Sequence, residues 1–210
     1  CCRGGATRSR NRGRDGIASG VSMIELVTEA IVVGKEPWRE RDARIFLYTK
    51  ELGLIAAKAT SARSPRAKLN AHLEPMNVIM VRLAQRQENE SAMFQISDAL
   101  IVDHCALWRD TSAHLEDGLE LVGFLKQQQI GDADLGIWGA AKKILTTPPR
   151  ATVATYKKEL LGVMGFEPMH ATCASCSAGG VAAFDFGSAI FYCKDCLQII
   201  ATNEAIVMLE

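Results

Sequence analysis

The sequence predicts an α+β protein in which a small β-barrel precedes a helical region that carries a metal-binding hairpin. Three observations lead to this fold class. Five short β-rich segments, separated by turns, fall between residues 28 and 100. From about residue 102 the apolar residues recur at helical spacing instead. Two Cys-x-x-Cys pairs then follow, with sixteen residues between Cys176 and Cys193.

The barrel is predicted from β-rich segments at residues 30–33, 43–50, 54–60, 77–83 and 93–100. Gly34 and Pro37 interrupt the chain after the first segment, and Gly53 closes a turn before the third. Five is the strand count of the oligonucleotide-binding (OB) fold, although other small barrels share it. We therefore predict an OB-fold domain over residues 23–103.

Residues 104–210 are predicted to form a helical domain. A helix capped by Thr111 or Ser112 extends to about residue 129, a second covers 131–145, and a third covers 152–164. Two short strands at 181–186 and 189–192 indicate a hairpin, within a zinc module at about 170–200. A last helix is expected over 197–210, with Asn203 as its cap.

The four cysteines of the module have the spacing of a four-thiolate zinc site: Cys173, Cys176, Cys193 and Cys196. Each tight turn brings two thiolates to one side of an ion, and the hairpin returns the second pair to complete a tetrahedron. Four thiolates leave no position for water, so we interpret the Zn²⁺ as structural. The alternatives are two disulfides, a redox dithiol or an empty reduced site. A redox Cys-x-x-Cys usually lies in a βαβ unit, which neither pair has.

The charges are unevenly distributed, although Lys+Arg and Asp+Glu both number 24. Residues 1–22 carry five Arg and one Asp, residues 23–103 are balanced, and residues 104–210 carry eight basic and twelve acidic side chains. A nucleic-acid role therefore needs a local basic patch. Residues 1–22 are predicted to be a disordered basic tail that need not belong to the natural product. Seven cysteines without a signal sequence, and no apolar run of membrane-spanning length, indicate a cytoplasmic protein.

Cations and aromatic side chains in the barrel region form a candidate nucleic-acid surface, because single-strand binding needs charges along the backbone and flat side chains for stacking. Alternation puts Phe46 and Tyr48 on one face of a strand; alternatively, Phe46 packs inside the barrel and Tyr48 covers its rim. Trp38, expected in a loop, is the better stacking candidate, or else a lid on the barrel end. The phosphate-binding candidates are Arg39, Arg41, Arg44, Lys58, Arg63, Arg66 and Lys68. Glu40 and Asp42 weaken the cluster formed by Arg39, Arg41 and Arg44. The loop at 58–68 is therefore the favoured phosphate-binding site.

Motifs for catalysis are missing from the sequence. It contains no phosphate-binding Gly-x-x-x-x-Gly-Lys-Ser/Thr, no Gly-x-Ser-x-Gly and no His-Glu-x-x-His. The four histidines are scattered along the chain. We therefore predict a protein that is not an enzyme and has no small-molecule substrate.

The order of these features resembles the RecO family of bacterial recombination mediators. The similarity lies in residues 28–32, 40–54, 57–59, 73–75 and 160–166, the last of which leads into the first cysteine pair as in zinc-bearing members. The chain departs from the family pattern with Ala59 in place of a usual glycine, a less basic loop at Ser64-Pro65, and an early C-terminus.

The resemblance implies an OB domain, a helical middle and a zinc module. It further implies binding of single- and double-stranded DNA, strand annealing, and loading of recombinase with RecR onto DNA coated by single-strand-binding protein. A nucleoid-associated location in the cytoplasm would follow. The alternative is a zinc-containing adaptor that binds proteins and has little intrinsic affinity for DNA.

Overall fold

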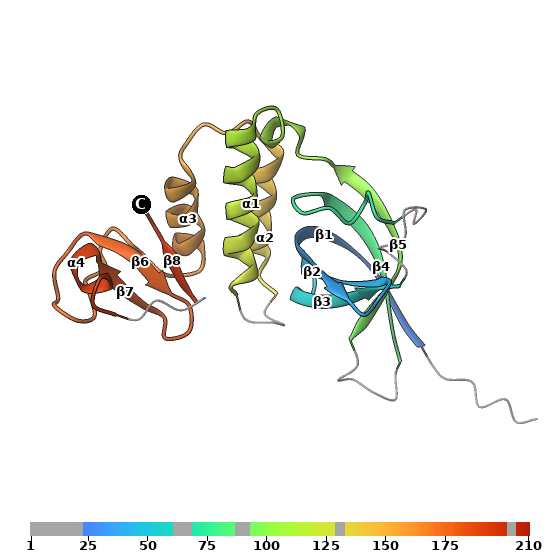
Figure 1. The fold of residues 1–210 in the computed structure, drawn as a ribbon, viewed down its shortest axis with the longest axis horizontal. Helices are drawn as coiled ribbons and strands as arrows, with labels where there is room; N and C mark the ends of the chain where they lie inside the picture. Colours follow the sequence, from blue (N-terminus) through green and yellow to red (C-terminus); the bar gives the residue numbers. More distant parts are fainter. Residues whose placement is uncertain (1–22, 61–68, 87–92, 129–132, 201–204) are drawn as a thin grey trace, which may run out of the picture.

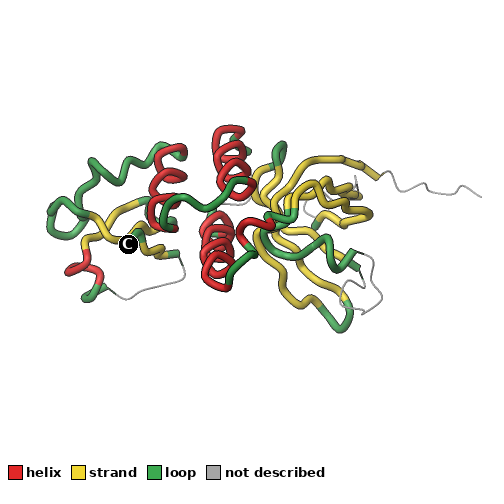
Figure 2. Tube along the Cα trace, turned by 90° about the horizontal axis from the view of Figure 1, so that it is seen from above, coloured by secondary structure: helices red, strands yellow, loops and turns green. Residues whose placement is uncertain are grey.

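The fold consists of a barrel, a layer of helices and a small second sheet, arranged in that order along the molecule (Figure 1). The structure is a computed structural model, and it describes residues 23–60, 69–86, 93–128, 133–200 and 205–210. Seen from above, the helices lie between the strands of the barrel and those of the second sheet (Figure 2). None of the helices in the described residues is long and apolar enough to cross a lipid bilayer.

Five strands close the N-terminal barrel: β1 (Met23–Trp38), β2 (Asp42–Thr49), β3 (Gly53–Ala59), β4 (Val78–Arg86) and β5 (Phe94–Asp103). They follow one another around the barrel in the order β1-β2-β3-β5-β4. All neighbours are antiparallel except β3 and β5, which pair in parallel at Ala57 opposite Phe94 and Lys58 opposite Gln95. The predicted five-stranded N-terminal barrel is confirmed, and its strand count and closure agree with the OB-fold expectation.

Strand β1 is much longer than predicted: it begins at Met23, and Gly34 and Pro37 do not interrupt it. Its first half pairs with β4 and its second half pairs with β2, with a register shift between Val32 and Gly34 where the strand changes partner. A bulge of this kind bends a strand, which helps a single strand to serve two sides of a barrel. Pro37 lies opposite Ala43, beyond the part of β1 that pairs with β4, so its missing N–H costs no ladder bond on that side.

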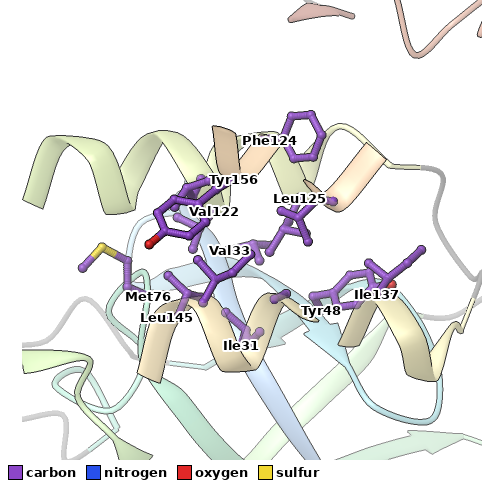
Figure 3. Close-up of a cluster of buried hydrophobic side chains, with 14 of the residues drawn as sticks. Ile31, Val33, Tyr48, Met76, Val122, Phe124, Leu125, Ile137, Leu145 and Tyr156 are labelled. Carbon is purple, nitrogen blue, oxygen red and sulfur yellow. The ribbon is translucent and has the colours of Figure 1, made fainter. Parts of the chain in front are cut away.

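The described residues form two apolar cores on the two sides of the barrel wall. The first fills the barrel and includes Ile45, Leu47, Ile79, Val81 and Leu83. The second lies between the outer wall of the barrel and the helices (Figure 3). There Ile31, Val33 and Tyr48 from the barrel pack with helical residues that include Val122, Leu125, Ile137 and Leu145. This second core joins barrel and helices through apolar contact.

The helical layer consists of α1 (Ser112–Lys126), α2 (Leu135–Thr146) and α3 (Val153–Val163), preceded by a short 3₁₀ helix η1 (Ala106–Trp108). Each of the three α-helices begins after a side chain that accepts a hydrogen bond from the first turn: Thr111, Asp134 and Thr152. The indole of the buried Trp108 donates to the carbonyl oxygens of Ile144 and Thr147, both at 3.1 Å, which ties η1 to the end of α2. The predicted helical middle is confirmed.

The second sheet contains β6 (Val181–Asp185), β7 (Ile190–Cys193) and β8 (Ile206–Met208), in the order β7-β6-β8, with a single helical turn α4 (Lys194–Leu197) after β7. The predicted hairpin is confirmed as β6 and β7. The predicted final helix over 197–210 is wrong, because Ile206 and Val207 extend along β6 and Leu209 is fully buried. The β-branched side chains favour this extended pairing. Asn203, its expected cap, lies outside the described residues.

Candidate metal centre and nucleic-acid surface

The four predicted ligands are brought together: the Sγ atoms of Cys173, Cys176, Cys193 and Cys196 all lie within 4.8 Å of one another. The Sγ atoms of Cys176 and Cys193 are 3.6 Å apart. A disulfide would require about 2.05 Å, whereas a tetrahedron with Zn–S bonds of about 2.3 Å has edges of about 3.8 Å. The cysteines are free thiols with the spacing of metal ligands.

The backbone around the first pair holds its two thiols on one side. The amide of Ser177 donates to the carbonyl of Cys173 at 2.8 Å, and the amide of Cys173 donates to the carbonyl of Ala178 at 2.8 Å. Ser177 has a left-handed backbone with φ 60, which closes the turn. In the second pair, Cys193 ends β7 and Cys196 lies in α4, so one helical turn separates their side chains.

The pKa values of the thiols show that the cysteines of this cluster oppose one another's ionisation. The backbone amides of Cys193 and Cys176 lower the pKa of Cys173 to about 6. The neighbouring thiols, Cys176 first, raise the pKa of Cys196 to about 12. Four thiolates in so small a space repel one another, and a bound dication removes that repulsion. Soft thiolate ligands in this number suit Zn²⁺. The donor set therefore fits a closed, four-coordinate metal site.

On the barrel, the structure joins the two basic clusters that are separate in the sequence. Arg44 on β2 lies directly opposite Lys58 on β3, and Trp38 on β1 lies directly opposite Asp42 on β2. Residues that face each other across a ladder, and residues two apart in a strand, point to the same side. Trp38, Asp42, Arg44 and Lys58 consequently share one face of the β1-β2-β3 ladder, which we call the ladder face.

Side-chain contacts within the ladder face are specific. The guanidinium carbon of Arg44 lies 3.8 Å from the centroid of the Trp38 ring, in a cation–π contact. The Nζ atom of Lys58 lies 3.0 Å from Oδ2 of Asp42, and the two side chains are 31% and 13% exposed. The sequence indicated Asp42 only as a charge that weakens the cluster. Its direct pairing with Lys58 depends on strand register, which the sequence does not show.

The other basic candidates lie around this face or outside the described residues. Arg39 and Arg41 are exposed in the turn between β1 and β2, where Arg39 has a left-handed φ of 57. Lys58 belongs to β3 and not to a loop. Arg63, Arg66 and Lys68, the rest of the favoured loop, lie outside the described residues, and so does the tail at 1–22.

The stacking candidates have different outcomes. Trp38 ends β1 and is only partly buried, and the Arg44 guanidinium covers one face of its ring. The prediction for Tyr48 is wrong, because its side chain is fully buried in the core between barrel and helices. Phe46 packs against the same core and is covered by Lys126, whose Nζ lies 4.1 Å from the ring centroid. The sequence did contain a signal for this burial. Strand β2 has apolar side chains on both faces, which is typical of a strand that is covered on both faces.

Two comparisons connect this chain to known proteins. Residues 23–103 match the family model described as Recombination protein O N terminal, which ends where β5 ends. The chain is also 25% identical over 159 residues to the DNA repair protein RecO of Thermobifida fusca (strain YX). That match covers 72% of this chain and 65% of the relative's length. By its N-terminal barrel, the chain is therefore similar to proteins of the RecO family.

Proposed function

We propose that this protein is a non-enzymatic DNA-binding mediator of recombinational gap repair. It binds single- and double-stranded DNA, anneals complementary strands, and acts with RecR to load recombinase onto DNA coated by single-strand-binding protein. The matching family model describes a recombination protein and the T. fusca relative is named a DNA repair protein, which supports a role in repair and recombination.

The observation that carries the DNA-binding proposal is the composition of the ladder face. Strands 2 and 3 of an OB-type barrel, with the loop between strands 1 and 2, are the surface on which such barrels bind oligonucleotides. Here that surface holds Arg44 against the ring of the partly buried Trp38, with the exposed Arg39 and Arg41 in the adjoining turn. Cations next to an aromatic ring are what a single strand needs for phosphate contact and base stacking.

The metal has a structural role in this proposal. The four cysteines hold Zn²⁺ and keep the second sheet and α4 together, and a bound Zn²⁺ supplies only cross-linking because its thiolate ligands leave no open position. No DNA contact is assigned to the module.

The experiment is a titration of a fluorescein-labelled thymidine oligonucleotide with the full chain over a series of NaCl concentrations. Affinity should fall steeply with salt, since each phosphate contact contributes about −0.7 to the logarithmic slope on single strands. Arg41→Ala should make that slope shallower by about 0.7 and weaken binding about fivefold at 0.1 M salt. Lys143→Ala removes another exposed cation, from α2, and should leave binding unchanged. A slope near zero, or equal effects of both variants, would contradict the proposal.

A second candidate function, a protein-binding adaptor with little DNA affinity, is favoured by a different face of the barrel. Val27, Met80 and Leu100 are 51%, 40% and 62% exposed, and Met80 lies opposite Leu100 across the ladder of β4 and β5. Adjacent apolar side chains with this exposure are typical of protein-binding surfaces. Absence of oligonucleotide binding at every salt concentration, together with retention of purified RecR, would favour this candidate.

A further inference from the structure

We propose that Asp42 is an affinity-determining residue of the ladder face: its carboxylate occupies Lys58 in place of a DNA phosphate, and a strand must displace it to gain that contact. This inference rests on the proposed DNA-binding function and names the residue that limits it. Asp42 therefore lowers both the affinity for DNA and the number of ions released on binding.

The geometry of the pair supports this role. The 3.0 Å from Lys58 Nζ to Asp42 Oδ2 is the length of an ordinary charge-assisted hydrogen bond, and a phosphate oxygen would bind the ammonium at a similar distance. Lys58 is directly opposite Arg44 in the ladder, so a backbone phosphate at Lys58 would lie next to the second cation. The carboxylate thus lies where the phosphate track of a bound strand would pass.

The pair is also exchangeable. The Lys58 side chain retains 31% exposure, whereas the Asp42 side chain is only 13% exposed. An incoming phosphate can therefore reach the ammonium from solvent while Asp42 stays in its place on β2. Because Lys58 exchanges one anion for another, its contact releases few counterions, unlike a contact made by a solvated cation.

A second ion pair of the barrel provides a matched control. Lys35 Nζ lies 2.6 Å from Oε1 of Glu74. Lys35 lies opposite Ile45, whose side chain points into the barrel, so this pair is on the other face of the strands. Glu74→Gln changes the net charge by the same amount as Asp42→Asn, but the lysine that loses its carboxylate lies away from the ladder face and keeps its hydrogen bond to Asn70 Oδ1 at 2.8 Å.

The test is a double-mutant cycle with the same labelled thymidine oligonucleotide. Asp42→Asn should tighten binding about fivefold at 0.1 M salt and steepen the logarithmic slope by about 0.7, the increment of one phosphate contact. Asp42→Asn in a Lys58→Ala background should give no such gain, because the cation that it frees is then missing. Asp42→Glu, which keeps a carboxylate, should bind like the wild type.

Three results would overturn the inference: no gain from Asp42→Asn, an equal gain in the absence of Lys58, or an equal gain from Glu74→Gln. The last two would show a general charge effect. Asp42→Ser replaces Asp42→Asn if thermal melting shows that the latter does not fold. Failure of the proposed function is a separate outcome, in which the wild type shows no salt-dependent binding and Arg41→Ala has no effect.

Discussion

The barrel and the cysteine module are both small sheets, but they are stabilised in different ways. The barrel buries side chains on two sides, filling its interior and packing its outer wall against the helices. The module has three strands of five, four and three residues, and it contributes Phe184 and Leu209 to the buried apolar core. Apolar burial suffices for a closed barrel, whereas a sheet this short needs a cross-link.

The barrel and the cysteine module also differ in the functional groups that they carry. The barrel presents its cations on a wall that closure has already made rigid, next to an aromatic ring. The module brings four thiols together at one point, with Cys173 and Cys193 buried and Cys176 exposed. The barrel cations therefore suit a ligand that binds from solvent, as proposed above, whereas the four thiols are placed to hold a metal ion between them.

The largest expected effect is that of metal loss. Zinc binding by small four-ligand modules contributes on the order of 10 kcal/mol, so chelation or Cys176→Ser should unfold residues 173–197 while the barrel stays folded. Hydrogen exchange read by mass spectrometry should show lost protection in β6 and β7 and retained protection in β1 to β5. Zinc content should fall in Cys176→Ser and remain normal in Ser175→Ala. Unchanged zinc content in Cys176→Ser would contradict the metal assignment.

The next effect concerns the aromatic contacts of the module. Phe184 is fully buried, with ring centroids of Phe166, Phe186 and Phe191 at 4.7, 5.1 and 4.8 Å. Phe184→Ala should lower the free energy of unfolding by about 3–5 kcal/mol, the usual cost of removing a buried ring. Denaturant titration with zinc present measures it. A cost below about 1 kcal/mol would show that the metal alone determines the stability of the module.

A smaller effect is a loss of folding stability at alkaline pH that originates at Cys105, directly after the barrel. Burial first, and then the charge of Asp103, raise the pKa of Cys105 from 9.0 to about 12. The unfolded chain therefore loses this proton at lower pH than the folded one, so the stabilisation is complete below pH 9 and declines as the pH rises towards 12. The slope is about 1.4 kcal/mol per pH unit for one group. Cys105→Ala should remove that slope in denaturant titrations between pH 9 and 11; an identical slope in both proteins would refute the assignment.

The smallest effect is that of a single ion pair between barrel and helices. Lys142 on α2 lies 2.6 Å from Glu29 on β1, with both side chains partly exposed. Lys142→Met should cost no more than about 1 kcal/mol, because pairs of this kind are well hydrated. The neighbouring Lys143→Met serves as the control, with a cost near zero. A larger loss in Lys142→Met would mean that charge, rather than the apolar core, holds the barrel to the helices.

The elements of the fold could be predicted where local patterns determine them. Strand alternation, helix caps such as Thr111, and the Cys-x-x-Cys spacing are all local, and each is found in the structure. Pro37 and the last strand were mispredicted because their conformation depends on partners distant in sequence. β1 tolerates a proline where β4 no longer pairs with it, and residues 206–208 are extended because β6 offers a free edge.

The candidate site was predictable in composition but not in arrangement. The residue types and the four cysteines are visible in the sequence. The burial of Tyr48 and the pairing of Asp42 with Lys58 follow instead from helix packing and from strand register. A cation next to an acid in the sequence cannot be distinguished from a cation paired with that acid across two strands.

The central claim is that the barrel binds DNA and the metal module only maintains the fold, and it is tested most directly by measuring oligonucleotide affinity before and after zinc removal. The full chain should be titrated with the labelled thymidine oligonucleotide, with hydrogen exchange followed on the same samples. The claim predicts an unchanged affinity in a protein whose module has lost its protection. Loss of binding while β1 to β5 remain protected would contradict it, since the DNA contacts would then lie in the cysteine module.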